Sequence, residues 1–144
     1  MAGRHDGAYE PLAALARELN LNGSVRFAGQ VLDVTGLLSA ADLAVFSSTI
    51  EGCPNGVLES MAAGLAVAGT NIDAIKSVVG PAGSQFLAPP RDEAALADAI
   101  LKLANDADLR VTIGAESRAW VLDKYTAWRM CEETVAVLEE LLTP

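Results

Sequence analysis

The sequence predicts an α/β fold built on a doubly wound parallel sheet. Two short apolar runs, residues 43–46 and 65–68, lack polar alternation, which is typical of strands buried on both faces. Helical patterns alternate with these runs along the chain, as they do in βα units. A composition of 51% hydrophobic and 20% charged residues over 144 residues allows one domain with a substantial core.

The first part of the chain is predicted to form a helix, a short strand and a second helix. Residues 8–20 place leucines at helical spacing after a proline in the first turn, where a missing N–H costs little. Residues 25–28 follow as a short strand. Asp33 is expected to cap a short helix with an apolar face at Leu37 and Leu38.

The middle of the chain alternates buried strands with helices. After the strand at 43–46 comes a loop, and a helix over residues 57–63 leads into the strand at 65–68. Apolar residues within 70–83 indicate a further short helix, and residues 85–87 a small strand.

The last third of the chain is predicted to be helical. Asp92, Asp106 and Thr126 each precede an apolar helical pattern, so each is expected to cap the start of a helix. Trp120 and Trp128 fall within these patterns, and we expect both to pack the C-terminal helices rather than to stack on sugars.

Charge and cysteine content exclude several classes of function. The formal net charge of −9 gives no electrostatic footprint for nucleic acid or for an anionic membrane. One histidine and two cysteines do not make a zinc pattern, so no metal is expected.

Cys131 is expected in the core, and Cys53 lacks the histidine that activates a thiol nucleophile. Without a membrane-spanning run or a signal peptide, a cytoplasmic location is expected.

One loop carries the candidate chemistry. Ligands of parallel sheets bind beyond the carboxyl ends of the strands, which singles out residues 29–33 and 47–57. In the second loop, small residues lead into a helix whose first N–H groups suit a phosphate. Glu51 and Glu59 flank this helix start, and each carboxylate can accept hydrogen bonds from vicinal ribose or sugar hydroxyls. The residues alone leave an alternative, in which Glu51 is a solvated loop acid and Glu59 a favourable first-turn charge.

Five segments, taken in order, resemble the family 4 retaining glycosyltransferases of GT-B fold. The stretch EGCPNGVLESMAAGLAVAGT at 51–70 resembles their signature, in which seven residues separate two glutamates. The other similar segments are RFAGQV at 26–31, AADLAVFSS at 40–48, FLAPPRDEAALADAI at 86–100 and KYTAWRMCEETVAVLEEL at 124–141. The resemblance implies that residues 1–144 are the Rossmann-like, nucleotide-sugar donor-binding half of such an enzyme.

The resemblance also assigns roles to residues. Glu51 would be the catalytic glutamate that faces the donor sugar, and Glu59 would hold the ribose hydroxyls. Gln30 and Val31 would read the base through the backbone. The sugar and diphosphate would be held by the loop and helix start, namely Gly52, Cys53, Pro54, Asn55, Gly56 and Val57. The reaction would transfer the sugar to an acceptor hydroxyl with retention, and no metal or other cofactor would be needed.

The sequence departs from the family pattern in three places. The first strands of the donor domain and the acceptor domain are expected to precede residue 1, so the chain would be incomplete. There is no Lys or Arg between Arg26 and Lys76, and residues 70–77 replace a Gly-Gly pair and a Pro-Glu pair. We therefore expect a chain that is inactive alone and works as a homodimer or with a separate acceptor-domain chain. The alternative is a non-catalytic nucleotide-sugar binding module or regulatory subunit.

Overall fold

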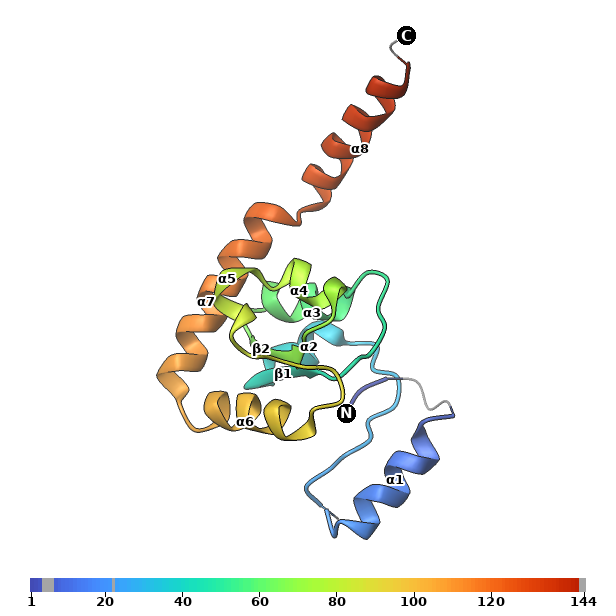
Figure 1. Ribbon diagram of the computed structural model, residues 1–144, viewed down its shortest axis with the longest axis vertical. Helices are drawn as coiled ribbons and strands as arrows, with labels where there is room; N and C mark the ends of the chain where they lie inside the picture. The colour runs from blue at the N-terminus through green and yellow to red at the C-terminus, as the bar shows by residue number, and fades with distance from the viewer. Residues whose placement is uncertain (4–6, 22, 143–144) are drawn as a thin grey trace. The chain divides into compact units, whose positions relative to one another are not determined.

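The computed structural model in Figure 1 describes residues 1–3, 7–21 and 23–142. The chain divides into two compact units, residues 1–37 and residues 38–144. Among the described residues, no helix combines the length and the apolar character that a membrane span requires.

The first unit contains α1 (Tyr9–Glu18) and the beginning of α2 (Val34–Ser39). Asp33 caps α2 as predicted, because its Oδ1 accepts a hydrogen bond of 2.8 Å from the Gly36 backbone N–H. The predicted strand over 25–28 is wrong: Gly29 makes an isolated parallel bridge with Ala2, and the described part of this segment joins no sheet. The Val25 N–H donates to the Leu21 carbonyl, and the Ala28 N–H donates to the Met1 carbonyl, a partner that the local sequence pattern does not reveal.

The second unit is built on a parallel sheet in the order β1-β2-β3. Its strands are β1 (Leu43–Phe46), β2 (Ala66–Thr70) and β3 (Leu87–Ala88). In the register, Phe46 lies opposite Gly69, and Thr70 lies opposite Ala88. Every residue of the central strand β2 is buried, which confirms the apolar strand expected at 65–68, although it runs from 66 to 70. β1 forms at the predicted residues 43–46, but none of them is buried and Val45 is 44% exposed, so the expectation of burial on both faces is wrong for β1, an edge strand of the described sheet.

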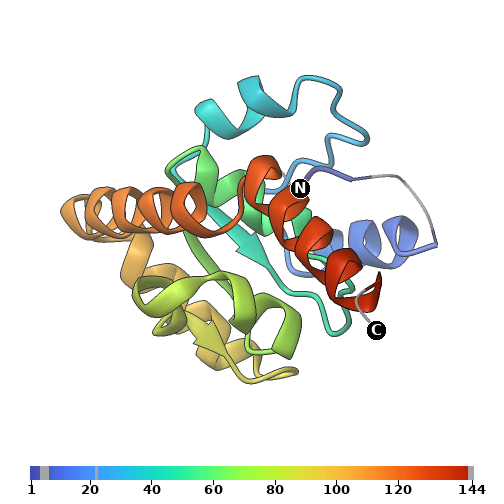
Figure 2. The ribbon, with the colours of Figure 1, turned by 90° about the horizontal axis from the view of Figure 1, so that it is seen from above.

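Six helices follow β1 in the described part of the second unit. They are α3 (Asn55–Ala62), α4 (Asp73–Val78), α5 (Gly80–Ser84), α6 (Glu93–Ala104), α7 (Ala107–Lys124) and α8 (Ala127–Leu142). The predicted caps are confirmed: Asp92, Asp106 and Thr126 each accept a backbone hydrogen bond from the first turn of α6, α7 and α8. Figure 2 shows α7 from above, where it runs beside α3 and α5.

Two cores lie on opposite faces of β2. Val67 packs against α3, α4 and α7 on one face, while Ala66 and Ala68 pack against α6 and α7 on the other. Successive side chains of a strand point to opposite faces, so one buried strand serves both cores. This arrangement is the predicted doubly wound architecture, in which helices cover both faces of a parallel sheet.

The turn between α3 and β2 is held tightly against α7. Gly64 ends α3 with a φ of 84°, a conformation that glycine adopts without strain. A Cβ atom placed on Gly114 of α7 would lie 2.0 Å from the Gly64 carbonyl oxygen. The absence of a side chain at Gly114 therefore sets how closely α7 approaches this turn.

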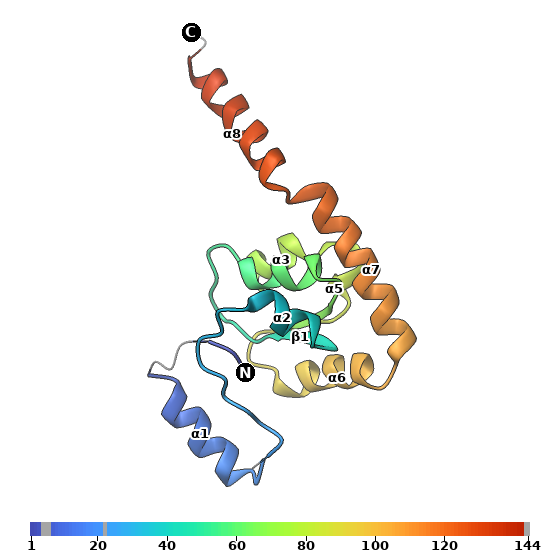
Figure 3. The same cartoon turned by 180° about the vertical axis from the view of Figure 1, so that it is seen from behind.

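The C-terminal helices confirm one prediction and correct two. Trp120 packs between elements as expected, and its Nε1–H donates to the Val78 carbonyl at 3.1 Å. Trp128 is 74% exposed and Cys131 is also exposed, so the predictions that they are packed are wrong. The reason is that α8 runs on beyond the end of α7, and none of its described residues is buried (Figure 3).

Candidate functional site

The candidate loop leaves the carboxyl end of β1 and enters α3. It runs from Ser47 to Pro54, and α3 begins at Asn55, two residues earlier than predicted. Asn55 and Gly56 have turn-forming character in the sequence, but here they form the first turn of the helix. No side chain caps this helix start. The Asn55 N–H donates to the Cys53 carbonyl and the Val57 N–H donates to the Pro54 carbonyl, both at 2.9 Å. The helix start lies at the carboxyl edge of the sheet, where parallel sheets bind ligands.

Packing fixes the start of α3 against the sheet. Pro54 and Val57 are buried, so the helix start is anchored from both sides of Asn55. A Cβ atom on Gly56 would lie 2.9 Å from Cε1 of Phe46, the last residue of β1. Glycine at this position thus allows the first turn of α3 to contact the end of β1.

Glu51 accepts a hydrogen bond from Ser48, whose backbone is in turn bonded to the end of β2. The Ser48 hydroxyl donates a hydrogen bond of 2.6 Å to Glu51 Oε1. The Thr70 hydroxyl donates to the Ser48 carbonyl, and Thr70 is only 4% exposed. A chain of two hydrogen bonds thus connects this carboxylate to the end of β2.

Glu59 lies on the exposed side of α3, whereas Ser60 and Met61 on the same helix are buried. The Ser60 hydroxyl donates to the Gly56 carbonyl at 2.7 Å, a bond within the helix. The structure thus places both predicted glutamates in the second unit, one in the loop after β1 and one on the helix that follows it.

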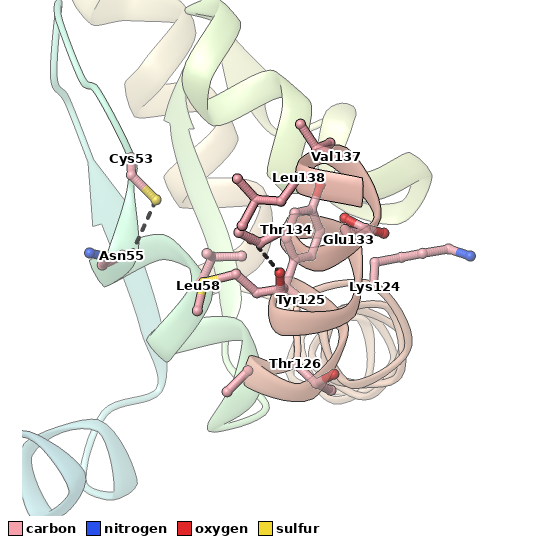
Figure 4. Close-up of a pocket in the computed structure, with 12 residues that line it drawn as sticks. Cys53, Asn55, Leu58, Lys124, Tyr125, Thr126, Glu133, Thr134, Val137 and Leu138 are labelled. Atoms are coloured by element: carbon pink, nitrogen blue, oxygen red, sulfur yellow. Dashed lines mark hydrogen bonds between the residues drawn. The ribbon is translucent and has the colours of Figure 1, made fainter. Parts of the chain in front are cut away.

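The tip of the loop borders a cavity of about 730 Å³. In Figure 4, Cys53 and Asn55 lie on one side of it, and the Cys53 thiol donates to Asn55 Oδ1 at 3.3 Å. Leu58 of α3, Tyr125 between α7 and α8, and Leu138 of α8 also line it. Sequence reasoning missed this contribution of α8, because no local signal links residues so far apart in the chain.

Gln30 and Val31 belong to the first unit, directly after the bridge between Ala2 and Gly29. Gln30 is exposed and Val31 is half-buried. The other predicted residues, 51–57 and 59, lie in the second unit. The structure therefore gathers the loop and helix residues, whereas the assignment of the base-reading pair stays a prediction.

Positive charge is sparse at the carboxyl edge of the sheet. After β2 the first cation is Lys76, an exposed residue of α4, and after β3 it is Arg91, which has a φ of 64°. Across residues 1–3, 7–21 and 23–142, no three His, Cys, Asp or Glu side chains gather closely enough to hold a metal ion. The loop after β1 and the helix that follows it offer backbone N–H groups, hydroxyls and the carboxylates of Glu51 and Glu59, groups that can bind a polyhydroxylated ligand with phosphate groups.

Comparison with known proteins identifies the family. A sequence profile described as Glycosyl transferases group 1 matches residues 1–106. The chain therefore belongs to the group 1 glycosyltransferases, and the predicted resemblance is confirmed at this level. It is also similar to N-acetyl-alpha-D-glucosaminyl L-malate synthase of Bacillus anthracis, with 25% identity over 128 residues, covering 89% of this chain and 34% of that protein.

Solved structures share the fold. Sucrose-phosphate synthase from Thermosynechococcus elongatus matches with a TM-score of 0.88 and 26% identity, over 98% of this chain and 37% of that one. Anabaena HepE, solved in complex with UDP, matches with a TM-score of 0.88 and 22% identity, over 96% of this chain and 40% of that one. The predicted α/β fold with a parallel sheet is confirmed and matches these GT-B neighbours. The chain spans about a third of the length of the curated relatives that it matches.

Proposed function

We propose that this chain is the donor-binding part of a family 4 retaining glycosyltransferase, which transfers a sugar from a nucleotide-sugar donor to an acceptor hydroxyl. The observation that carries the proposal is the loop between β1 and α3, where Glu51 is held in the loop and Glu59 is exposed on the helix. Family membership and a structural neighbour crystallised with UDP support a nucleoside diphosphate as the ligand of this loop.

Each group of the loop has a role that its chemistry suits. Backbone groups of the loop and helix start, from Gly52 to Val57, bind the sugar and the diphosphate, because a helix start without a side-chain cap carries partial positive charge. Glu59 accepts hydrogen bonds from the ribose, and Glu51 from the donor sugar, where it is the catalytic residue. Gln30 and Val31 read the base.

The leaving diphosphate sets the main electrostatic demand. Helix starts and cations stabilise such a group without a metal, so we propose that no metal or other cofactor takes part. The loop itself has no cation, and Lys76 and Arg91 are the first ones that follow β2 and β3. We propose that the isolated chain is inactive and that a homodimer or a separate acceptor-domain chain supplies the remaining charge.

The free edge of β1 supports an assembly with a further chain. Within the described residues, β1 pairs with β2 alone, so its other edge presents unpaired backbone groups. Both cysteines are free and exposed, which suits a reducing compartment and the proposed cytoplasmic location.

A second function, a nucleotide-sugar binding module without catalysis, is favoured by the same shortage of cations at the loop. The two functions differ in turnover. A transferase completed by its partner releases free nucleoside diphosphate and a glycosylated acceptor, whereas a binding module retains the donor intact.

Thermal melting with UDP, GDP and ADP in turn tests the proposal. A nucleotide at 100 times its dissociation constant adds about 2.7 kcal/mol of stability, so the fitting base raises the melting temperature. Glu59→Gln should raise the dissociation constant of that nucleotide by roughly tenfold or more, because hydrogen bonds to a charged acceptor contribute about 1.5–3 kcal/mol. Glu93→Gln, a matched change in the first turn of α6, should leave binding unaltered. Equal binding by the two variants would contradict the assignment of Glu59.

A further inference from the structure

A pair of hydroxyl groups links Glu51 to the sheet. Thr70 is the last residue of β2 and lies one step beyond the final β1–β2 pair, Phe46 with Gly69. Its hydroxyl donates to the carbonyl of Ser48, which is two residues past the end of β1. Thr70 thereby continues the contact between the two strands with a side chain, at the point where the loop would otherwise leave the sheet.

Ser48 in turn bonds to the Glu51 carboxylate. Its hydroxyl donates to Glu51 Oε1 at 2.6 Å, within the range of strong hydrogen bonds to an ionised acceptor. A glutamate has several rotatable bonds, and fixing them when a ligand arrives costs entropy. Here the carboxylate is already held by one oxygen, while its second oxygen and its remaining lone pairs can accept bonds from a ligand.

We propose that Ser48 and Thr70 are positioning residues, which fix the Glu51 carboxylate for the hydroxyls of the donor sugar before the donor binds. This inference rests on the proposed function. Neither residue needs to contact the ligand, since Thr70 acts on the Ser48 backbone and Ser48 acts on Glu51. Their effect is therefore on the sugar portion of the donor and not on the nucleotide.

Comparing the affinities for UDP and for UDP-glucose distinguishes this positioning role from a purely structural one. In the full chain, the dissociation constants of UDP and UDP-glucose are measured by calorimetry. For Ser48→Ala, UDP-glucose should bind about tenfold more weakly, while UDP changes less than about twofold. Thr70→Val removes the buried hydroxyl at nearly constant shape, and it should show the same pattern with a smaller loss. A general disturbance of the loop would weaken both probes equally.

Matched variants sharpen the test. Ser47→Ala removes the neighbouring exposed hydroxyl and should leave both constants unchanged. Ser48→Thr retains a hydroxyl and should recover most of the affinity for UDP-glucose. In the double variant Ser48→Ala with Glu51→Gln, the loss should equal that of Glu51→Gln alone, because Ser48 acts through Glu51.

The outcomes are distinguishable. If the unaltered chain binds none of UDP, GDP, ADP and UDP-glucose, the proposed function is contradicted and the positioning role is contradicted with it. If GDP or ADP is the nucleotide that binds, the same comparison is made with that nucleotide and its glucose ester. If the chain binds UDP-glucose more tightly than UDP and Ser48→Ala leaves that preference intact, the positioning role alone is contradicted. Additive losses in the double variant would also overturn it.

Discussion

Gly114→Ala should destabilise the fold, although a glycine to alanine change inside a helix is ordinarily favourable. At an unconstrained site in the middle of a helix, alanine gains about 1 kcal/mol over glycine. In α7, the added Cβ would lie 2.0 Å from the Gly64 carbonyl oxygen and 3.0 Å from its carbonyl carbon. The obstacle is backbone, so rotation of a side chain cannot relieve the overlap.

The size of the effect follows from what must move. Either α7 shifts away from the turn, which loosens the buried Ile113 and Val121, or the turn moves together with β2. Overpacking of this kind costs about 1–3 kcal/mol and sometimes more. Because the overlap is with backbone, we expect the upper figure of about 3 kcal/mol, which less the gain of about 1 kcal/mol from alanine leaves a net loss of about 2 kcal/mol in the free energy of unfolding. Tm should fall by roughly 2–4 °C per kcal/mol.

Urea denaturation followed by far-UV circular dichroism measures this change. Gly7→Ala is the matched control, because a Cβ there would have no neighbour within 4 Å. Its free energy of unfolding should stay within about 0.5 kcal/mol of the unaltered chain. A Gly114→Ala variant that is as stable as the unaltered chain, or more stable, would refute the reasoning.

Three further predictions concern other parts of the second unit. Leu103→Ala should cost about 2–5 kcal/mol, measured by urea denaturation, because Leu103 is fully buried between α6 and β2; a loss below about 1 kcal/mol would contradict this packing. Asp92→Ala should cost about 1 kcal/mol by removing the 2.9 Å cap bond to Ala95, whereas Asp92→Asn should retain most of it. A hydrogen bond and the charge of Lys124 hold the pKa of Asp123 below its usual range, so Lys124→Gln should raise that pKa in an NMR titration. Because the folded-state pKa of Asp123 is depressed, its small stabilising effect is present above the unfolded pKa and is lost as the pH falls through the folded value.

Local features of the fold could be predicted from the sequence. A cap is decided by a side chain and a backbone N–H three residues later, so Asp92, Asp106 and Thr126 were identified without tertiary information. The apolar run that forms β2 was equally clear, because a central parallel strand is buried on both faces.

Features that depend on distant partners were predicted less well. Residues 25–28 have strand-like composition, but a strand needs a neighbour, and among the described residues this segment joins no sheet. The apolar pattern of α8 identifies a helix face without identifying what covers it, so Trp128 and Cys131 were wrongly placed in a core.

The candidate site shows the same division. The spacing of Glu51 and Glu59 could be recognised in the sequence, and the structure places them in the loop and on the helix after β1. The bonds from Ser48 and Thr70 could not be predicted, because serine and threonine near a strand end have many alternative partners.

The central claim is that the loop and the start of α3 bind a nucleoside diphosphate. Backbone amide chemical shifts of the ¹⁵N-labelled chain, recorded while UDP is added, test it most directly. The account predicts saturable shifts concentrated at residues 51–59. Saturable shifts confined to other parts of the chain, or no shifts with UDP, GDP and ADP, would contradict it.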